Sequence, residues 1–386
     1  MKTYLIVKPE KAAEVERVFQ DTSINICETG RHYLDGTIGS AEFQTEFVSG
    51  TISSWVKEVE RLTGVANSQP HAAYAPLTHS LLGRWLYLIR VTDRSANLLL
   101  QPLEEAIRTK LIPTLTGQSP LNDNVRHLLA LPARLGGMGI INPSDIAESQ
   151  QHASTACCKP LVDLIIQQQG DFGTATQKQK DAMSQLRRGR QQAVKEKAST
   201  VLSELPEEQR RCAQLAQEKG SSSWLIALPI QHLGFALHKG AFRDAVSLRY
   251  GWDLRMAPQK CRCGQAFEIN HVLTCRQGGF HTIRHNELRD TLSALLSEVC
   301  QEVSTEPPLQ PLTGEWLTRS ANKEPNARLD IRARGFWDGM QDAFFDVRVF
   351  HPLAPSYRSQ KVSALYRQHE SKKRLEYGQS SGGGTW

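Results

Sequence analysis

The sequence predicts an α+β protein with a mostly helical N-terminal part, followed by a cysteine and histidine knuckle and a small sheet with flanking helices. Three observations predict this class. Apolar residues recur at helical spacing through much of the first half, metal-ligand residue types cluster in 261–275, and two short apolar segments near the C-terminus each contain an aspartate. We expect four regions, at 1–40, 41–169, 170–223 and 224–386.

Length and composition limit the function classes. A chain of 386 residues is long enough for two or three domains with separate cores. The net charge of +6 fits a polyanionic partner without requiring one. No run approaches the roughly 20 apolar residues of a membrane span, and the N-terminus lacks a signal-peptide pattern. We therefore expect no membrane partner and a location in the nucleus or cytoplasm rather than secretion.

The first 169 residues predict short strands and then helices. Tyr4–Val7 is typical of a strand and 10–19 of a helix, and 31–39 predicts a hairpin around an Asp35-Gly36 turn. From Ser40 the apolar period becomes helical. The stretch 170–223 is rich in Gln, Lys, Arg and Glu, which predicts a polar basic connector with a domain boundary near Ser221. Within it Arg187-Arg188-Gly189-Arg190 could touch phosphates or simply form a solvated face.

Four residues in the pattern C-x-C-x7-H-x3-C predict a zinc site. Three thiolates and an imidazole complete a tetrahedral zinc site without an open position, so its role would be structural. The single residue between the first two cysteines departs from the usual C-x2-C spacing, and ordinary buried thiols are the alternative. The predicted ligands are Cys261, Cys263, His271 and Cys275, with His281, His285 or Cys300 as substitutes.

Two aspartates lie on predicted neighbouring strands. Asp330 lies in the alternating segment 328–333, and Asp346 in the apolar segment 344–350. Pairing these strands would place the two carboxylates side by side, where a hard divalent cation such as Mg²⁺ would relieve their repulsion. The alternative is a solvated strand pair without function. The pattern resembles the core of the restriction-like, PD-(D/E)xK nucleases.

That nuclease family has a lysine two residues after its second carboxylate, where this chain has Arg348. An arginine can hold a phosphate but cannot act as a base. The helix expected after Pro352 offers a replacement, because Lys373 and Tyr377 lie on one helical stripe. We choose Lys373 as the active-site lysine, with Lys361 as the reserve.

Four segments resemble the end of the palm and the thumb of reverse transcriptases from non-LTR retrotransposons: 2–8, 32–39, 69–74 and 129–140. In that family the hairpin near 34–39 is the primer grip, which implies that Leu34 and Gly36 contact nucleic acid. The sequence contains no Asp-Asp pair for a polymerase metal motif. We therefore expect no polymerase activity by itself, and the chain looks truncated.

The order of the predicted parts also resembles the retrotransposon proteins that have a restriction-like endonuclease. The resemblance implies that Asp330 and Asp346 bind Mg²⁺, that Lys373 orients water or phosphate with support from Tyr377, and that Arg284 and His285 face DNA. Nicked target DNA would then prime reverse transcription of an RNA, so DNA and RNA are the expected partners. The alternatives are a non-catalytic, decayed or domesticated nucleic-acid-binding protein with a structural zinc site, or a helical scaffold for protein contacts.

Overall fold

The computed structural model describes residues 3–92, 98–119, 121–307 and 328–377, with side chains up to Arg374 in the last range. It confirms the α+β class, because the described chain is mostly helical and its sheets have only two or three strands. The chain divides into two compact units, Met1–Arg255 and Met256–Trp386. Among the described residues, no helix is long and apolar enough to cross a membrane.

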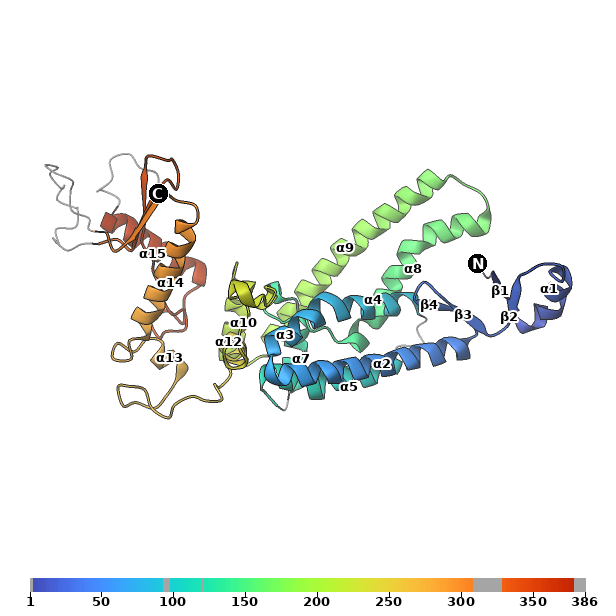
Figure 1. The fold of residues 1–386 in the computed structure, drawn as a ribbon, viewed down its shortest axis with the longest axis horizontal. Coiled ribbons are helices and arrows are strands. Elements are labelled where there is room, and N and C mark those ends of the chain that lie inside the picture. Colours follow the sequence, from blue (N-terminus) through green and yellow to red (C-terminus); the bar gives the residue numbers. More distant parts are fainter. Residues whose placement is uncertain (1–2, 93–97, 120, 308–327, 378–386) are drawn as a thin grey trace. The chain divides into compact units, whose positions relative to one another are not determined.

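The first unit begins with two small sheets (Figure 1). A parallel pair of strands comes first, and an antiparallel hairpin follows it. Their elements in chain order are β1 (Tyr4–Ile6), η1 (Pro9–Lys11), α1 (Ala12–Val18), β2 (Asn25–Cys27), β3 (Gly30–Tyr33) and β4 (Gly36–Gly39).

The hairpin turns one residue earlier than the sequence predicted. Leu34 and Asp35 occupy the turn with φ angles of 48° and 57°, as a two-residue turn between twisted strands requires. The Tyr87 hydroxyl donates a hydrogen bond to the Leu34 carbonyl and holds the turn in place. Gly36 lies in β4 and is buried, and a Cβ at this position would lie 3.4 Å from Val91 Cγ2. Leu34 is thus exposed and Gly36 is covered.

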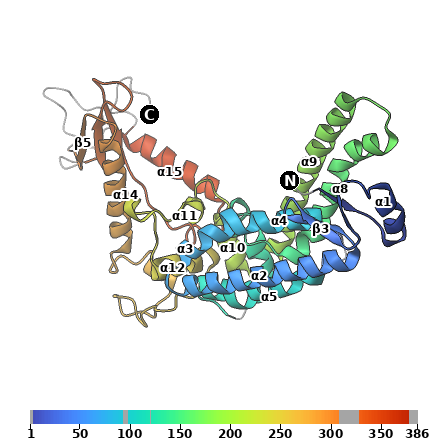
Figure 2. The ribbon, with the colours of Figure 1, turned by 45° about the vertical axis from the view of Figure 1, so that its right-hand side comes forward.

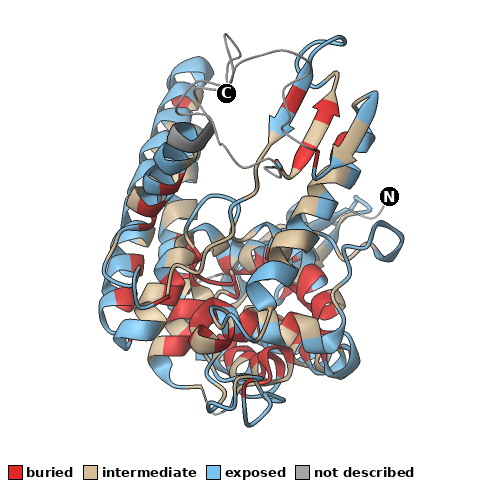
Figure 3. Ribbon diagram, turned by 90° about the vertical axis from the view of Figure 1, so that its left-hand side faces the viewer, coloured by how far each residue is buried: buried red, intermediate tan, exposed pale blue. Residues whose placement is uncertain are grey.

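The rest of the first unit is helical. The longest early helix, α2, begins after Ser40, whose hydroxyl accepts the Phe43 N–H as an N-cap. The helices and single turns in chain order are α2 (Ala41–Ser68), α3 (Pro70–Pro76), η2 (Leu77–Leu81), α4 (Leu82–Val91), α5 (Gln101–Ala106), η4 (Ile107–Leu111), α6 (Ile112–Thr116), α7 (Asp123–Ala130), η5 (Ala133–Leu135), α8 (Pro143–Gln167), α9 (Phe172–Ser203), α10 (Glu207–Leu215), α11 (Ser223–Ile226), η6 (Gln231–Leu233) and α12 (Lys239–Tyr250). Their buried faces form one hydrophobic core, which Figure 3 shows in red where the helices pack.

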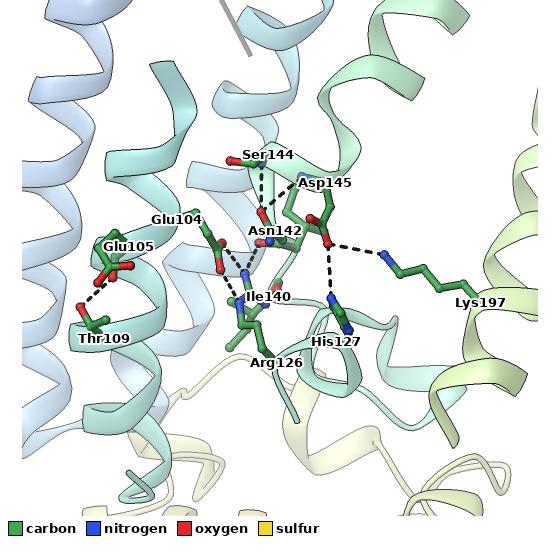
Figure 4. A network of polar contacts seen from close by, with 11 residues as sticks. Glu104, Glu105, Thr109, Arg126, His127, Ile140, Asn142, Ser144, Asp145 and Lys197 are labelled. Carbon is green, nitrogen blue, oxygen red and sulfur yellow. Dashed lines mark hydrogen bonds and ion pairs between the residues drawn. The ribbon is translucent and has the colours of Figure 1, made fainter. Parts of the chain in front are cut away.

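A buried ion pair joins α7 to α5 inside this core (Figure 4). The Arg126 guanidinium lies 2.7 Å from the Glu104 carboxylate and also donates to the carbonyls of Ile140 and Ile141. Both charged side chains are almost completely buried. Removing either partner alone would leave an uncompensated buried charge, at a cost of about 3–5 kcal/mol.

The segment 170–223 was predicted to be a polar connector, but the structure shows that it is not a linker. Most of it is helix α9, which packs side by side and antiparallel with α8 (Figures 1 and 2). Near its C-terminal end, α9 buries Ala198, Val201 and Leu202 in the core of the first unit. The polar composition arises because the preceding turns contact neighbours on one side only, so that most of their positions face solvent.

The predicted domain boundary near Ser221 is also wrong. Helix α12 follows that point, and its Phe242, Val246 and Tyr250 are completely buried in the core of the first unit. The boundary therefore falls after Arg255, in an exposed segment where Met256 is 96% accessible.

The second unit has a three-stranded antiparallel sheet in the order β5-β6-β7, with α14 packed against β5 and β6. Leu296 of α14 and Ile331 and Ala333 of β6 form its small buried cluster. Its elements are α13 (Ile269–Val272), α14 (Phe280–Ser297), β5 (Glu302–Thr305), β6 (Ile331–Arg334), β7 (Asp342–Phe345) and α15 (Val362–Tyr377).

The two predicted strands are shorter than expected, and β5 was not predicted. β6 begins just after Asp330, and β7 ends just before Asp346, so the segment 347–350 is not a strand. The ladder stops there because the Val347 N–H donates to the Asp330 carboxylate, at 2.5 Å, rather than to a strand carbonyl.

Candidate metal centre and carboxylate site

The four predicted zinc ligands lie together in the second unit. One ligand atom from each of Cys261, Cys263, His271 and Cys275 lies within 4.8 Å of all the others. Such a group could hold a zinc ion, since zinc bonds of about 2.0–2.3 Å place tetrahedral ligands at comparable separations. Only Cys261 is buried, so the set as a whole is not packed into a core as ordinary buried thiols would be.

Local backbone geometry creates this group in spite of the C-x-C spacing. The Cys261 N–H donates to the Gln265 carbonyl at 2.8 Å, and Gly264 has a φ of 90°, so the chain reverses sharply between the first two cysteines and α13. Cys263 Sγ then lies 3.1 Å from His271 Nε2. The backbone N–H of Gly278 beside Cys275 lowers the pKa of that thiol, which favours the thiolate that a metal binds.

The two aspartates lie opposite each other at one end of the sheet. The pairing of Ile331 with Phe345 is the last in the ladder, and the same antiparallel register places Asp330 opposite Asp346. Both carboxylates are largely covered, with 15% and 17% of their side-chain surface accessible. Burial raises the pKa of Asp346; Lys373 opposes this rise, and the neighbouring Asp330 carboxylate adds to it.

A lysine and a histidine from two helices complete the carboxylate site. Lys373 of α15 places Nζ 2.5 Å from Asp346 Oδ2, and His285 of α14 places Nε2 3.1 Å from Asp330 Oδ1. The reserve residue Lys361 is exposed before α15 and forms no ion pair with a described carboxylate. The structure therefore brings Lys373 and not Lys361 to the aspartates. We call Asp330, Asp346, Lys373 and His285 the carboxylate site.

The carboxylates of Asp330 and Asp346 are oxygen groups of the kind that bind hard cations. Mg²⁺ is held in proteins by one or two carboxylates, with water and phosphate oxygens filling its other positions. Asp330 and Asp346 are two such carboxylates, and burial disfavours the charged form of Asp346 by raising its pKa. A cation there would lower the repulsion between the two carboxylates.

Other predicted site residues lie elsewhere or serve other contacts. Arg284 donates to the Leu273 carbonyl at 2.7 Å and is half-buried, so it joins α14 to the knuckle. Arg348 is exposed after β7, and its charge adds to the burial that lowers the pKa of His369. The side chain of Tyr377 lies outside the described residues.

The sequence interpretation missed two polar links within the second unit. His351 Nε2 lies 2.9 Å from Oδ1 of Asn270, the neighbour of the ligand His271. Burial lowers the pKa of His351 to about 4, and the Arg284 charge adds to this effect. His285, which was expected to face DNA, contacts Asp330. No sequence pattern could have given these pairs, because their members are 45 or more positions apart along the chain.

Comparison with known proteins adds no family to this description. No protein-family model matches the chain, and no curated protein is significantly similar to it.

Proposed function

We propose that the second unit is a Mg²⁺-dependent endonuclease that nicks DNA, and that the chain is part of a protein like the non-LTR retrotransposon reverse transcriptases. The observation that supports this proposal is the meeting of Asp330, Asp346 and Lys373 at one end of the sheet, with Lys373 Nζ 2.5 Å from Asp346. Two carboxylates with an adjacent ammonium group match the needs of phosphodiester hydrolysis.

Each residue has a definite part in this chemistry. Magnesium, when bound, would supply an activated water and offset the charge on the phosphate. Asp330 and Asp346 would hold the ion, while the His285 imidazole fixes the orientation of Asp330 from its other side. Lys373 would release Asp346 to the ion and turn its ammonium group to a non-bridging phosphate oxygen.

A plasmid-nicking assay with Mg²⁺ tests the proposal. We expect the wild-type chain to convert supercoiled plasmid to open circles and Asp346→Ala to lose this activity. Asp338→Ala is the matched control, because Asp338 is an exposed carboxylate in the loop between β6 and β7. Lys373→Ala should likewise lose activity while Lys361→Ala keeps it. Equal nicking by wild type and Asp346→Ala would exclude the assignment.

One observation favours the non-catalytic alternative. Each carboxylate already has a protein partner, because Lys373 Nζ lies 2.5 Å from Asp346 Oδ2 and His285 Nε2 lies 3.1 Å from Asp330 Oδ1. A nucleic-acid-binding protein with a structural zinc site would need no more. Salt-sensitive binding of DNA without any Mg²⁺-dependent nicking would support this second candidate.

A further inference from the structure

Helix α9 of the first unit exposes a long basic face. The helix runs from Phe172 to Ser203, and none of its positions between Ala175 and Ala198 is fully buried. Along this stretch it packs on α8, which leaves the opposite side to solvent (Figures 1 and 2). The helix has two acidic residues, Asp181 and Glu196. Its basic residues are Lys178, Lys180, Arg187, Arg188, Arg190, Lys195 and Lys197.

Six exposed residues of α9 form a stripe without an acid. They recur at i, i+4, i+7, i+8, i+11 and i+15, which places them on one face of the helix over about 22 Å at 1.5 Å per residue. The residues of this α9 stripe are Lys180, Ser184, Arg187, Arg188, Gln191 and Lys195. Its four cations form no ion pair with any residue that the structure describes, whereas Lys197, outside the stripe, lies 3.6 Å from Asp145 (Figure 4).

A glycine beside the two arginines removes bulk from the exposed surface. Gly189 lies in the middle of α9, and a Cβ added there would meet no atom within 4 Å. Helix packing therefore does not require a glycine at this position, although glycine costs a helix interior about 1 kcal/mol relative to alanine. Because glycine has no Cβ, a partner could come close to the helix backbone between Arg188 and Arg190, which would account for a glycine at this position.

We propose that the α9 stripe binds the phosphate backbone of double-stranded nucleic acid, independently of sequence. Its chemistry is complementary to phosphate, since guanidinium, ammonium, hydroxyl and amide groups are the usual phosphate-contacting donors. A double strand fits better than a single strand, because single-strand binding relies on aromatic stacking and α9 has no aromatic residue after Phe172. The stripe belongs to the first unit, so this binding does not depend on cleavage by the carboxylate site.

Fluorescence anisotropy with a short labelled DNA duplex of mixed sequence tests this surface. The full chain is titrated without Mg²⁺ over a range of salt concentrations, next to the variant Arg187→Gln/Arg188→Gln. The matched control is Lys219→Gln/Lys239→Gln, which removes two exposed cations of the same unit outside α9. Glutamine keeps the helix propensity of the replaced residues, so folding should be retained in both variants.

We expect the α9 variant to bind the duplex about tenfold more weakly and its salt slope to fall by about two, because each phosphate contact contributes close to one. The control should keep the wild-type slope. Equal duplex affinity and slope for the two double variants would overturn the proposal. The absence of duplex binding by the wild-type chain would overturn it as well. The two proposals are tested separately. If the wild-type chain shows no nicking but the α9 variant still binds the duplex more weakly than the wild type, the α9 stripe is supported and the endonuclease proposal is not.

Discussion

At the residue scale, the carboxylate site depends on two side chains from different helices. His285 belongs to α14, which precedes the three strands in the chain, and Lys373 belongs to α15, which follows them. Lys373 forms an ion pair with Asp346, and His285 contacts Asp330. The covered position of Asp346 makes its pairing with Lys373 important. An exposed ion pair would contribute little, but a partly buried one leaves a poorly solvated charge behind when one partner is removed.

Two glycines give a test of local packing. A Cβ at Gly137 would lie 1.9 Å from the Leu131 carbonyl oxygen, and backbone cannot move aside as a flexible side chain would. We expect Gly137→Ala to lower the free energy of unfolding by at least about 1–3 kcal/mol. Gly189→Ala should instead raise it by up to about 1 kcal/mol, because the methyl group meets open space in a helix interior.

Urea unfolding followed by circular dichroism measures both glycine variants against the wild type. Opposite signs for the two substitutions are expected. An unchanged stability of Gly137→Ala would contradict the close backbone approach, and a destabilised Gly189→Ala would show that this position of α9 is not open.

At the scale of elements, the knuckle and the sheet are joined through α13 and α14. Arg284 at the start of α14 bonds the Leu273 carbonyl between the ligands His271 and Cys275, and the next residue, His285, contacts Asp330. Asn270 adds the link to His351. A metal bound by the knuckle would therefore stabilise the supports of the carboxylate site as well as its own loop.

Zinc content provides the test of the knuckle. Purified wild-type chain should hold one zinc ion, and Cys275→Ser should lose it, because serine does not replace a thiolate ligand. Cys300→Ser is the control: Cys300 packs beside the cluster around Leu296 and outside the four-ligand group, so this variant should keep its zinc. Atomic absorption after gel filtration gives the stoichiometry. Retention of zinc by Cys275→Ser, or its loss from Cys300→Ser, would contradict the ligand set.

At the scale of the whole molecule, the chain has two units with separate cores, one large and helical and one small. Among the described residues of the second unit, the apolar cluster has three buried members, Leu296, Ile331 and Ala333. A core of this size supplies little stability by itself, and a structural metal is a common supplement in small units. A metal in the knuckle would therefore stabilise the second unit whether or not that unit has nuclease activity.

Limited proteolysis tests the division. Trypsin should cut early after Arg255, in the exposed segment between the units, and release a product that ends at this residue. The arginines at 187, 188 and 190 should resist at first, since they lie inside a packed helix and not in a linker. Mass spectrometry identifies the first products. Early ends at 187–190 instead of 255 would show that the stretch opens as the sequence alone had suggested.

The sequence alone was sufficient for the α+β class and for the four residues that the structure brings together in the knuckle. These ligands lie within fifteen positions of one another, so a single tight turn and one short helix bring them together. The sequence also predicted the strands next to Asp330 and Asp346. It did not predict where these strands end, because the hydrogen bond from the Val347 N–H to the Asp330 side chain decides where the ladder stops.

Only the tertiary structure decided the remaining features. It placed His285 on Asp330, chose Lys373 over Lys361, and made a core-packed helix from a stretch whose composition suggested a linker. The physical reason is range: spacing along the chain determines local turns and the faces of helices, whereas contacts between distant segments depend on how whole elements pack. A polar sequence such as that of α9 reports only how much of its surface faces water, and does not show which other helix covers the rest.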